Sequence, residues 1–153
     1  MPVYQSKNNP YRILFICTGN SCRSQMAEGL ARSSGCKAYS AGVFPSQVNP
    51  RSITVMAELG IDISQHVSNA VTDFVNDQFD MVITLGETAR KHLPHFTGIV
   101  KEFIHHPVYD PYNTSGTDDE VLPVYRRVRD ELKEWIDGLC ASDDLNPSSP
   151  DCR

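Results

Sequence analysis

The sequence has no apolar segment long enough to span a membrane, and residues 1–10 lack the apolar run of a secretory signal. It also has no excess of positive charge, since 14 lysines and arginines stand against 19 acidic residues in 153. The resulting net charge of −5 argues against nucleic acid or an anionic membrane surface as a partner. We therefore expect a cytoplasmic protein that binds neither.

Regularly spaced cysteines are absent as well. The five cysteines are an odd number without a repeating interval, which is not the pattern of a disulfide framework. The pairs His92-x-x-His95 and His105-His106 lack the cysteine or acidic neighbours of a zinc site, so we assign no metal ligands to them. No internal repeat is visible, and the length suits a single compact domain.

Apolar runs and helically spaced apolar residues alternate along the chain. The spacing predicts strands at 11–17, 37–41, 79–85 and 99–104, helices at 22–34, 50–59, 87–92 and 117–139, and one helical turn at 71–76. Strands that alternate with helices predict an α/β fold, in which a parallel sheet lies between helices. Ligands of such sheets bind at the carboxyl ends of the strands.

The first strand runs into a Cys-x5-Arg segment, Cys17-Thr18-Gly19-Asn20-Ser21-Cys22-Arg23-Ser24. A tight loop between a strand and a helix turns its backbone N–H groups toward one centre, and Arg23 can fork onto two oxygens of a tetrahedral anion. Positive φ is expected at Gly19 and Asn20. The expected anion-binding residues besides Arg23 are Thr18, Gly19, Asn20, Ser21, Cys22 and Ser24.

Cys17 faces the bound anion in this arrangement, so we interpret it as a nucleophile. A helix N-terminus and a nearby arginine lower the pKa of a cysteine from about 8.5 to about 3.5–7.5, which favours the reactive thiolate. Ser24 is expected to donate a hydrogen bond to this sulfur. The alternative is a buried cysteine in a strand-to-helix turn, and the strand before, glycine within and helix after the segment disfavour it.

Several further motifs follow in order, namely Tyr39-Ser40-Ala41-Gly42, Asn49-Pro50, Gly60-Ile61-Asp62-Ile63-Ser64, Asp80-Met81-Val82-Ile83-Thr84 and Asp110-Pro111. With the Cys-x5-Arg loop they make the chain resemble the low-molecular-weight protein tyrosine phosphatase superfamily, and within it the arsenate reductases most. The resemblance implies a single domain at residues 11–139 with a four-stranded parallel sheet flanked by helices. We expect residues 1–10 and 140–153 to be flexible termini.

Two features separate the branches of the superfamily. Only six residues, 43–48, precede Asn49-Pro50, whereas tyrosine phosphatases usually carry a longer loop with an aromatic beside the substrate. This short loop favours a small inorganic anion, and Phe44 is either such an aromatic or, by preference, an anchor against the core. In contrast, Asp110-Pro111-Tyr112 resembles the acid loop of the phosphatases.

The resemblance implies an enzyme, and Asp110 is our general acid for the leaving group. The first hypothesis is an arsenate reductase, in which Cys17 forms a covalent arsenate adduct that a second thiol resolves. The alternative is a phosphatase of phosphotyrosine or small aryl phosphates, in which water attacks phosphocysteine. A noncatalytic oxyanion sensor is the third.

Several thiols are candidates for the one that resolves the Cys17 adduct. Related reductases have a redox cysteine directly after Thr84-Leu85, where this chain has Gly86. The candidates are Cys22, the tail cysteines Cys140 and Cys152, and an external thiol from thioredoxin, glutathione with glutaredoxin, or mycothiol. A redox-protein partner is therefore part of the prediction, and we otherwise expect a monomer.

The resemblance implies one further ligand. Related reductases bind a structural potassium ion where this chain has Asn20, Glu28, Ser40 and Asn69. Because Asn69 replaces an acidic residue, the case for a cation is weakened, and we interpret Glu28 as a brace for the loop. No other cofactor is expected.

Overall fold

The computed structural model describes residues 11–141. Its strands are β1 (Arg12–Cys17), β2 (Lys37–Gly42), β3 (Phe79–Thr84) and β4 (Val100–His105). Its α-helices are α1 (Arg23–Ser33), α2 (Pro50–Ala57), α3 (Glu87–Lys91) and α4 (Asp118–Ala141), and single 3-10 turns lie at η1 (Val71–Asp73) and η2 (Pro111–Asn113). Within the described residues, no helix is long and apolar enough to cross a membrane.

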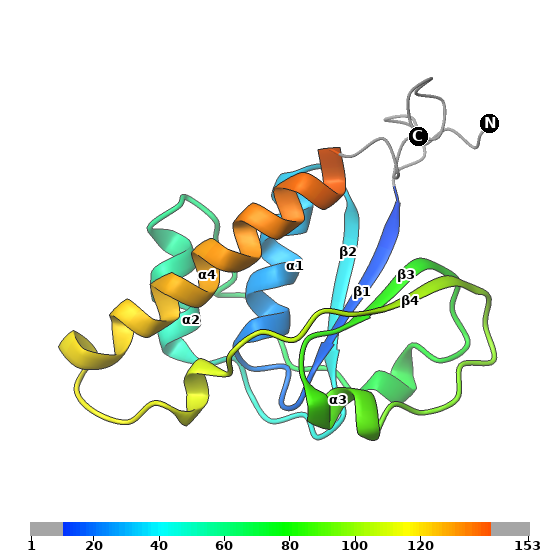
Figure 1. The fold of residues 1–153 in the computed structure, drawn as a ribbon, viewed down its shortest axis with the longest axis horizontal. Coiled ribbons are helices and arrows are strands. Elements are labelled where there is room, and N and C mark those ends of the chain that lie inside the picture. The colour runs from blue at the N-terminus through cyan, green and yellow to red at the C-terminus, as the bar shows by residue number, and fades with distance from the viewer. Residues whose placement is uncertain (1–10, 142–153) are drawn as a thin grey trace.

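The four strands form one parallel sheet in the order β2-β1-β3-β4, which confirms the predicted fold. All carboxyl ends of the strands therefore lie at one edge of the sheet. The loop from the central strand β1 into α1 leaves from this edge, and the start of β1 and the end of α4 lie at the opposite edge (Figure 1). The topology places Cys17 where ligands of parallel sheets bind.

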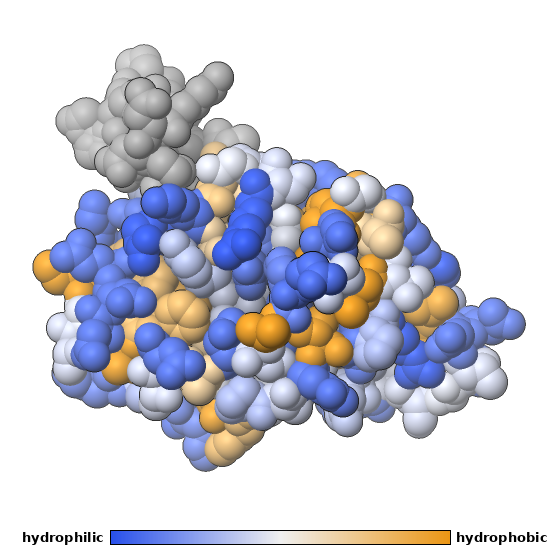
Figure 2. Space-filling model, turned by 180° about the vertical axis from the view of Figure 1, so that it is seen from behind, coloured by the Kyte–Doolittle hydropathy of each residue, from blue (hydrophilic) through white to orange (hydrophobic). Residues whose placement is uncertain are grey.

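Alternate residues of β1 enter two separate cores, as the two-residue period of a strand requires. Ile13 and Phe15 are fully buried in a cluster that α1, α2 and α4 complete. Leu14 and Ile16 are equally buried on the other face, where η1, α3 and their connections cover the sheet. A fully buried side chain of this size contributes about 1.5–3 kcal/mol, so β1 is anchored from both sides. On the outer surface seen in Figure 2, hydrophilic side chains interrupt the apolar ones.

The predicted elements are present with shifted ends. Gly35 has φ of 94° just after α1, a left-handed conformation that suits glycine and ends the helix. The largest shift concerns α4, which continues through Ala141. Cys140 therefore lies in the last turn of a helix and not in a flexible tail. The predicted flexible residues 1–10 and 142–153 lie outside the described part of the chain.

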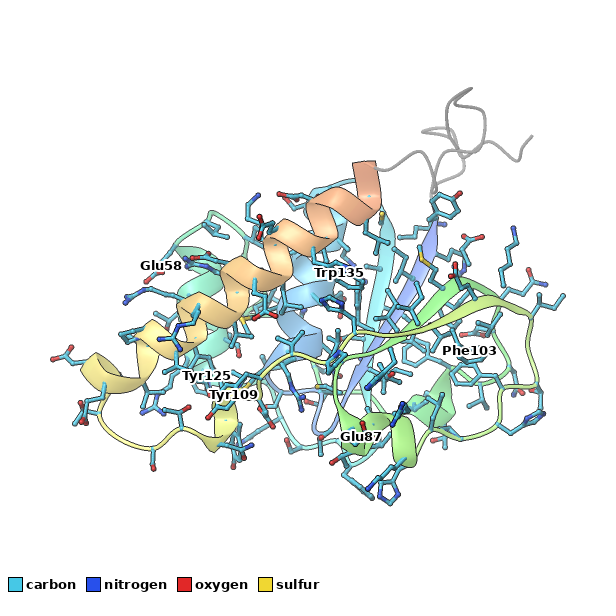
Figure 3. The ribbon with its side chains drawn as sticks, in the orientation of Figure 1. Glu58, Glu87, Phe103, Tyr109, Tyr125 and Trp135 are labelled. Atoms are coloured by element: carbon cyan, nitrogen blue, oxygen red, sulfur yellow. The ribbon has the colours of Figure 1, made fainter. Side chains whose placement is uncertain are left out.

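Glu58 links α2 to α4. Its carboxylate accepts three hydrogen bonds from the Arg126 guanidinium, at 2.9–3.2 Å, and one from Arg129 Nη1 at 2.7 Å. Arg129 is itself 7% exposed and also donates to the Val55 carbonyl at the end of α2. In Figure 3, Glu58 lies beside the middle of α4. The hydrogen bonds from Arg126 and Arg129 lower the pKa of Glu58 to about 2.

This ion pair predicts a pH dependence of stability. Because the folded state depresses the pKa of Glu58 from 4.5 to about 2, its stabilising effect is complete above about pH 5 and is lost between these values as the pH falls. Glu58→Gln should therefore lower the melting temperature at pH 7, and its difference from wild type should shrink toward pH 3. Glu134→Gln, on α4 and without an ion pair among the described residues, is the control. A constant difference across this range would contradict the prediction.

Candidate active site

The carbonyl oxygens of the loop after β1 point outward. Those of Cys17, Thr18, Gly19 and Ser21 accept hydrogen bonds from the backbone N–H groups of Val43, Phe44, Ser46 and Asn49, at 2.8–3.2 Å. The Asn20 carbonyl accepts from the side chains of Gln25 and Ser68. Residues 43–49 therefore brace the outside of the loop.

Each peptide unit is planar and trans, so a carbonyl held outward turns the N–H group of the next residue inward. Within residues 11–141, none of the seven N–H groups from Thr18 to Ser24 donates to a backbone carbonyl or a side chain outside α1. Together with the N-terminus of α1, these donors form a binding site for a tetrahedral anion.

Asn20 fixes the turn of the loop. Its φ is 52°, in the left-handed region that asparagine tolerates better than most residues, which agrees with the expectation. Its fully buried amide donates to Ser24 Oγ and Ser40 Oγ at 2.8 and 2.9 Å, and its oxygen accepts from the Asn69 backbone N–H. The expectation for Gly19 is wrong, because its φ is not positive. A Cβ on Gly19 would instead lie 3.1 Å from Ser46 Oγ, a tight contact.

Gly42, at the end of β2, permits the loop to pack against the sheet. A Cβ there would lie 2.7 Å from both the Asn20 nitrogen and the Thr18 oxygen. These are backbone atoms of the anion loop, so they have little freedom to move away. The glycine that closes the Tyr39-Ser40-Ala41-Gly42 motif is therefore a requirement of the site.

Cys17 is the last residue of β1 and is 2% exposed. Its sulfur lies 2.9 Å from Ser24 Oγ, the contact that the sequence predicts. Ser24 Oγ also accepts from Asn20, so its own proton is free to point toward the sulfur. Such a hydrogen bond stabilises a thiolate.

Arg23 begins α1, and its side chain is 6% exposed. Its Nη1 donates to the carbonyls of Leu85 and Val108 at 3.1 and 3.3 Å, and its Nη2 donates to Asp110 Oδ2 at 3.2 Å. Among the described residues, its buried Nε–H has no hydrogen-bond partner. Leaving a buried charged donor unpaired is costly, and an anion oxygen would satisfy it.

Asp110 comes from the other side of the site, just before η2. Its Oδ1 accepts from the Tyr112 backbone N–H at 3.1 Å, which caps the 3-10 turn, and its side chain is 25% exposed. Its other oxygen contacts Arg23, as described above. The fold thus brings Cys17, Arg23 and Asp110 around one cavity, although Asp110 is 87 residues from Arg23.

The cavity has a volume of about 230 Å³. Its floor is the anion loop, and its rim carries two aromatic side chains, Phe44 and Tyr112, which are 55% and 66% exposed. Phe44 contacts the His92 ring edge-on at 5.1 Å between centroids. The preferred interpretation of Phe44 as a core anchor is therefore wrong, because the short loop places its ring at the mouth of the cavity.

The family described as Low molecular weight phosphotyrosine protein phosphatase matches residues 12–147. The chain belongs to this family. The arsenate reductase of Halalkalibacterium halodurans is 43% identical over 127 residues, which are 81% of this chain and 91% of that protein. The glutaredoxin arsenate reductase of Synechocystis sp. is 34% identical over 133 residues, which are 85% and 96%. A solved arsenate reductase in its oxidized state superposes with a TM-score of 0.73 at 34% identity and covers 89% of this chain and 99% of its own.

The predicted resemblance is thereby confirmed, and this member of the low molecular weight phosphatase family is an enzyme of the arsenate reductase and phosphatase type. The structure places the candidate second thiols at different distances from Cys17. Cys22 lines the cavity but its sulfur contacts Tyr125 Oη at 3.5 Å, and burial raises the pKa of the Cys22 thiol. Cys140 lies beside Cys36 at the opposite edge of the sheet and not beside Cys17. Cys152 lies outside the described residues.

Gly86, at the position of the missing relay cysteine, faces Arg23. A Cβ on Gly86 would lie 3.3 Å from Arg23 Cζ and closer still to Nη1. The guanidinium therefore occupies the space that a side chain at position 86 would need. The glycine at position 86 therefore leaves room for the Arg23 guanidinium where it stands.

The four residues at the potassium position do not suit a cation in this chain. Glu28 already pairs with Arg32 at 2.9 Å and accepts from Ser40 Oγ at 2.6 Å. The Asn20 oxygen accepts from Asn69, whose own amide donates to backbone carbonyls. Because the Arg32 guanidinium pairs with Glu28 and the oxygens already have partners, we retain the interpretation of Glu28 as a brace for the loop through Ser40.

Two bracing residues, Gln25 and Ser68, were not recognised in the sequence. Gln25 donates from Nε2 to the carbonyls of Asn20 and Val67, and its oxygen lies 2.9 Å from His66 Nδ1. Ser68 donates to the Asn20 carbonyl at 2.8 Å. Gln25 directly follows the Cys-x5-Arg-Ser segment, and a polar residue that points inward from the first turn of α1 was the available signal.

Proposed function

We propose that this protein is an arsenate reductase that forms a covalent Cys17–arsenate adduct and completes turnover with an external thiol. The observation that carries the proposal is the loop itself. The inward N–H groups of Thr18 to Cys22, the N-terminus of α1, Arg23 and the Cys17 sulfur converge on one small cavity, in a chain 43% identical to an arsenate reductase. A tetrahedral oxyanion is the ligand class that satisfies all of these donors.

The first step is in-line attack by the Cys17 sulfur on arsenic. The S–As bond forms as an As–O bond breaks, and the departing oxygen takes up protons to leave as water. Asp110 stands across the cavity from the loop and is the proposed proton donor. The loop N–H groups and Arg23 stabilise the charge on the remaining oxygens.

The second step needs another thiol. Its thiolate attacks the Cys17 sulfur, the S–As electron pair passes to arsenic, and arsenite leaves as a disulfide forms on Cys17. Arsenic gains two electrons and the two sulfurs lose them. A further thiol then reduces the disulfide and restores Cys17.

We infer that the second thiol comes from outside the protein. Gly86 carries no thiol, Cys140 lies at the far edge of the sheet, and the raised pKa of Cys22 makes it a weak attacking group. The cavity mouth is open beside Phe44 and Tyr112, where a thiol could approach. Glutathione with glutaredoxin is the first candidate, because a 34% identical relative is named a glutaredoxin arsenate reductase.

The test measures arsenite formation from arsenate with glutathione plus glutaredoxin, thioredoxin with its reductase, and mycothiol with its redoxin, each in turn. We expect turnover with one thiol system and a mixed disulfide on Cys17 when the reaction is stopped early. A Cys22→Ser variant should retain turnover, whereas intramolecular resolution by Cys22 would abolish it. No arsenite with any of the three systems would reject the proposal.

A phosphatase activity is the second candidate, and the aromatic rim favours it. Phe44 and Tyr112 flank the cavity mouth, where an aryl ring could lie between them. If the protein hydrolyses an aryl phosphate, Asp110→Asn should reduce kcat by about 10²-fold or more, because the leaving phenolate loses its proton donor. Asp118→Asn, which removes a charge from an exposed pair with Arg51, is the control. Equal hydrolysis by wild type and Asp110→Asn would argue against this role.

A further inference from the structure

A second pair of thiols lies far from the anion loop. Cys36 and Cys140 are both partly buried, and their sulfurs are 2.9 Å apart although 104 residues separate them in sequence. Cys36 directly precedes β2, and Cys140 is in the last turn of α4. Neither takes part in the arsenate chemistry proposed above.

The surrounding structure holds both cysteines in place. The Cys36 backbone N–H donates to the Ala31 carbonyl at 3.0 Å, and Lys37 begins the ladder of β2 with β1. Ser34 Oγ contacts Asp137 Oδ1 at 3.4 Å, one turn before Cys140. Both cysteines also pack against the main hydrophobic core. The two sulfurs therefore meet where the last turn of α4 lies beside the start of β2.

The pKa values of the two thiols are shifted in opposite directions. Its hydrogen bond with Cys140 lowers the pKa of Cys36, whereas the hydrogen bond to Cys36, burial and the negative charge of Asp137 raise the pKa of Cys140. Either sulfur can donate in the 2.9 Å contact, and the lowered pKa gives Cys36 the greater thiolate character. In thiol–disulfide exchange the group with more thiolate character attacks first, which here is Cys36.

We propose that Cys36 and Cys140 form a reversible disulfide, a redox site separate from Cys17. The oxidant is a low-molecular-weight disulfide such as oxidised glutathione. Cys36 attacks one of its sulfurs and releases one glutathione thiolate. Cys140 then loses its proton and attacks the Cys36 sulfur, which releases the second glutathione. Two protein thiols are oxidised and one glutathione disulfide is reduced to two thiols.

The sheet keeps this site apart from catalysis. Lys37 pairs with Arg12 and Gly42 pairs with Cys17, so the five steps along β2 put about 17 Å between the two ends. Figure 1 shows the end of α4 and the β1–α1 loop at opposite edges of the sheet. Oxidation of Cys36 and Cys140 therefore leaves the Cys17 thiol unconsumed. The new bond would join the last turn of α4 to the start of β2.

The test uses the full-length protein, equilibrated in glutathione buffers of increasing oxidised fraction, alkylated and mapped by mass spectrometry. We expect a Cys36–Cys140 linked peptide that dithiothreitol removes. The melting temperature should rise by about 5–15 °C in the oxidised protein, because the bond closes a loop of about 100 residues. Cys36→Ser and Cys140→Ser should each lose the oxidation-dependent rise, and Cys36→Ser should retain wild-type arsenate turnover.

Two results would overturn the proposal. One is independent alkylation of Cys36 and Cys140 in buffers that oxidise other thiols of the protein. The other is a disulfide that joins either cysteine to Cys17, Cys22 or Cys152. Both are read on the wild-type chain, so they do not depend on a variant that folds. Because arsenate turnover is assayed separately, failure of the disulfide leaves the proposed reductase reaction to its own test.

Discussion

Replacing Cys17 by serine is expected to lower arsenate turnover by about 10⁴-fold or more, to the level of the background reaction. The hydroxyl of serine lacks a nearby base, since the partner of this position is Ser24 Oγ at 2.9 Å. The anion loop is unchanged, because its donors are backbone N–H groups and Arg23. Binding of inorganic phosphate, measured by calorimetry, should therefore stay within a few-fold of wild type.

Cys36→Ser is the matched control for this variant, because it makes the same chemical change at the opposite edge of the sheet. It should retain turnover. The informative comparison is between binding and turnover, since a misfolded Cys17→Ser protein would lose both. Substantial arsenite formation by a well-folded Cys17→Ser variant would refute the role of Cys17 as the nucleophile.

The second large effect is expected for Arg23→Lys, with a loss of about 10²–10³-fold in kcat/KM. Lysine keeps the charge but has one point of contact where the guanidinium has three nitrogens. In this structure Nη1 holds two carbonyls, Nη2 contacts Asp110, and the unpaired Nε is left for the anion. A single ammonium group cannot hold the two carbonyls, contact Asp110 and bind the anion at the same time.

Arg23→Lys should also loosen Asp110, because the salt bridge at 3.2 Å is lost. We therefore expect both a weaker affinity for phosphate and a lower kcat. Arg90→Lys, in the exposed i,i+3 pair with Glu87 on α3, is the control and should behave as wild type. If the affinity for phosphate and the kcat of Arg23→Lys both stay within about threefold of wild type, the backbone N–H groups alone are enough for anion binding and catalysis.

The anion loop could be predicted because its signal is local. An apolar strand, a cysteine, small residues and an arginine stand within twelve positions, so the short backbone between them sets their relative placement. The left-handed conformation of Asn20 follows from the same segment. The role of Asp110 could be predicted only from the order of motifs along the chain, because nothing near it in sequence indicates that it contacts Arg23.

The remaining features depend on contacts between distant segments. Gln25 and Ser68 hold the same carbonyl from elements 43 residues apart, and a polar residue in a helix or loop gives no periodic signal of such a partner. Cys140 was assigned to the tail because polar composition continues past Leu139, whereas packing on the core extends α4 to Ala141. Phe44 was misplaced because an aromatic residue in a short loop has the same sequence signal in a core and at a cavity mouth.

Gly86 carries a consequence for how members of this family can diverge. Its missing side chain leaves the space that Arg23 fills beside the Leu85 carbonyl. A cysteine at this position would displace the flexible end of Arg23 and disturb its contact with the Leu85 carbonyl. A single codon change at Gly86 would therefore act on two properties of the site together, a thiol beside the cavity and the position of the anion-binding guanidinium.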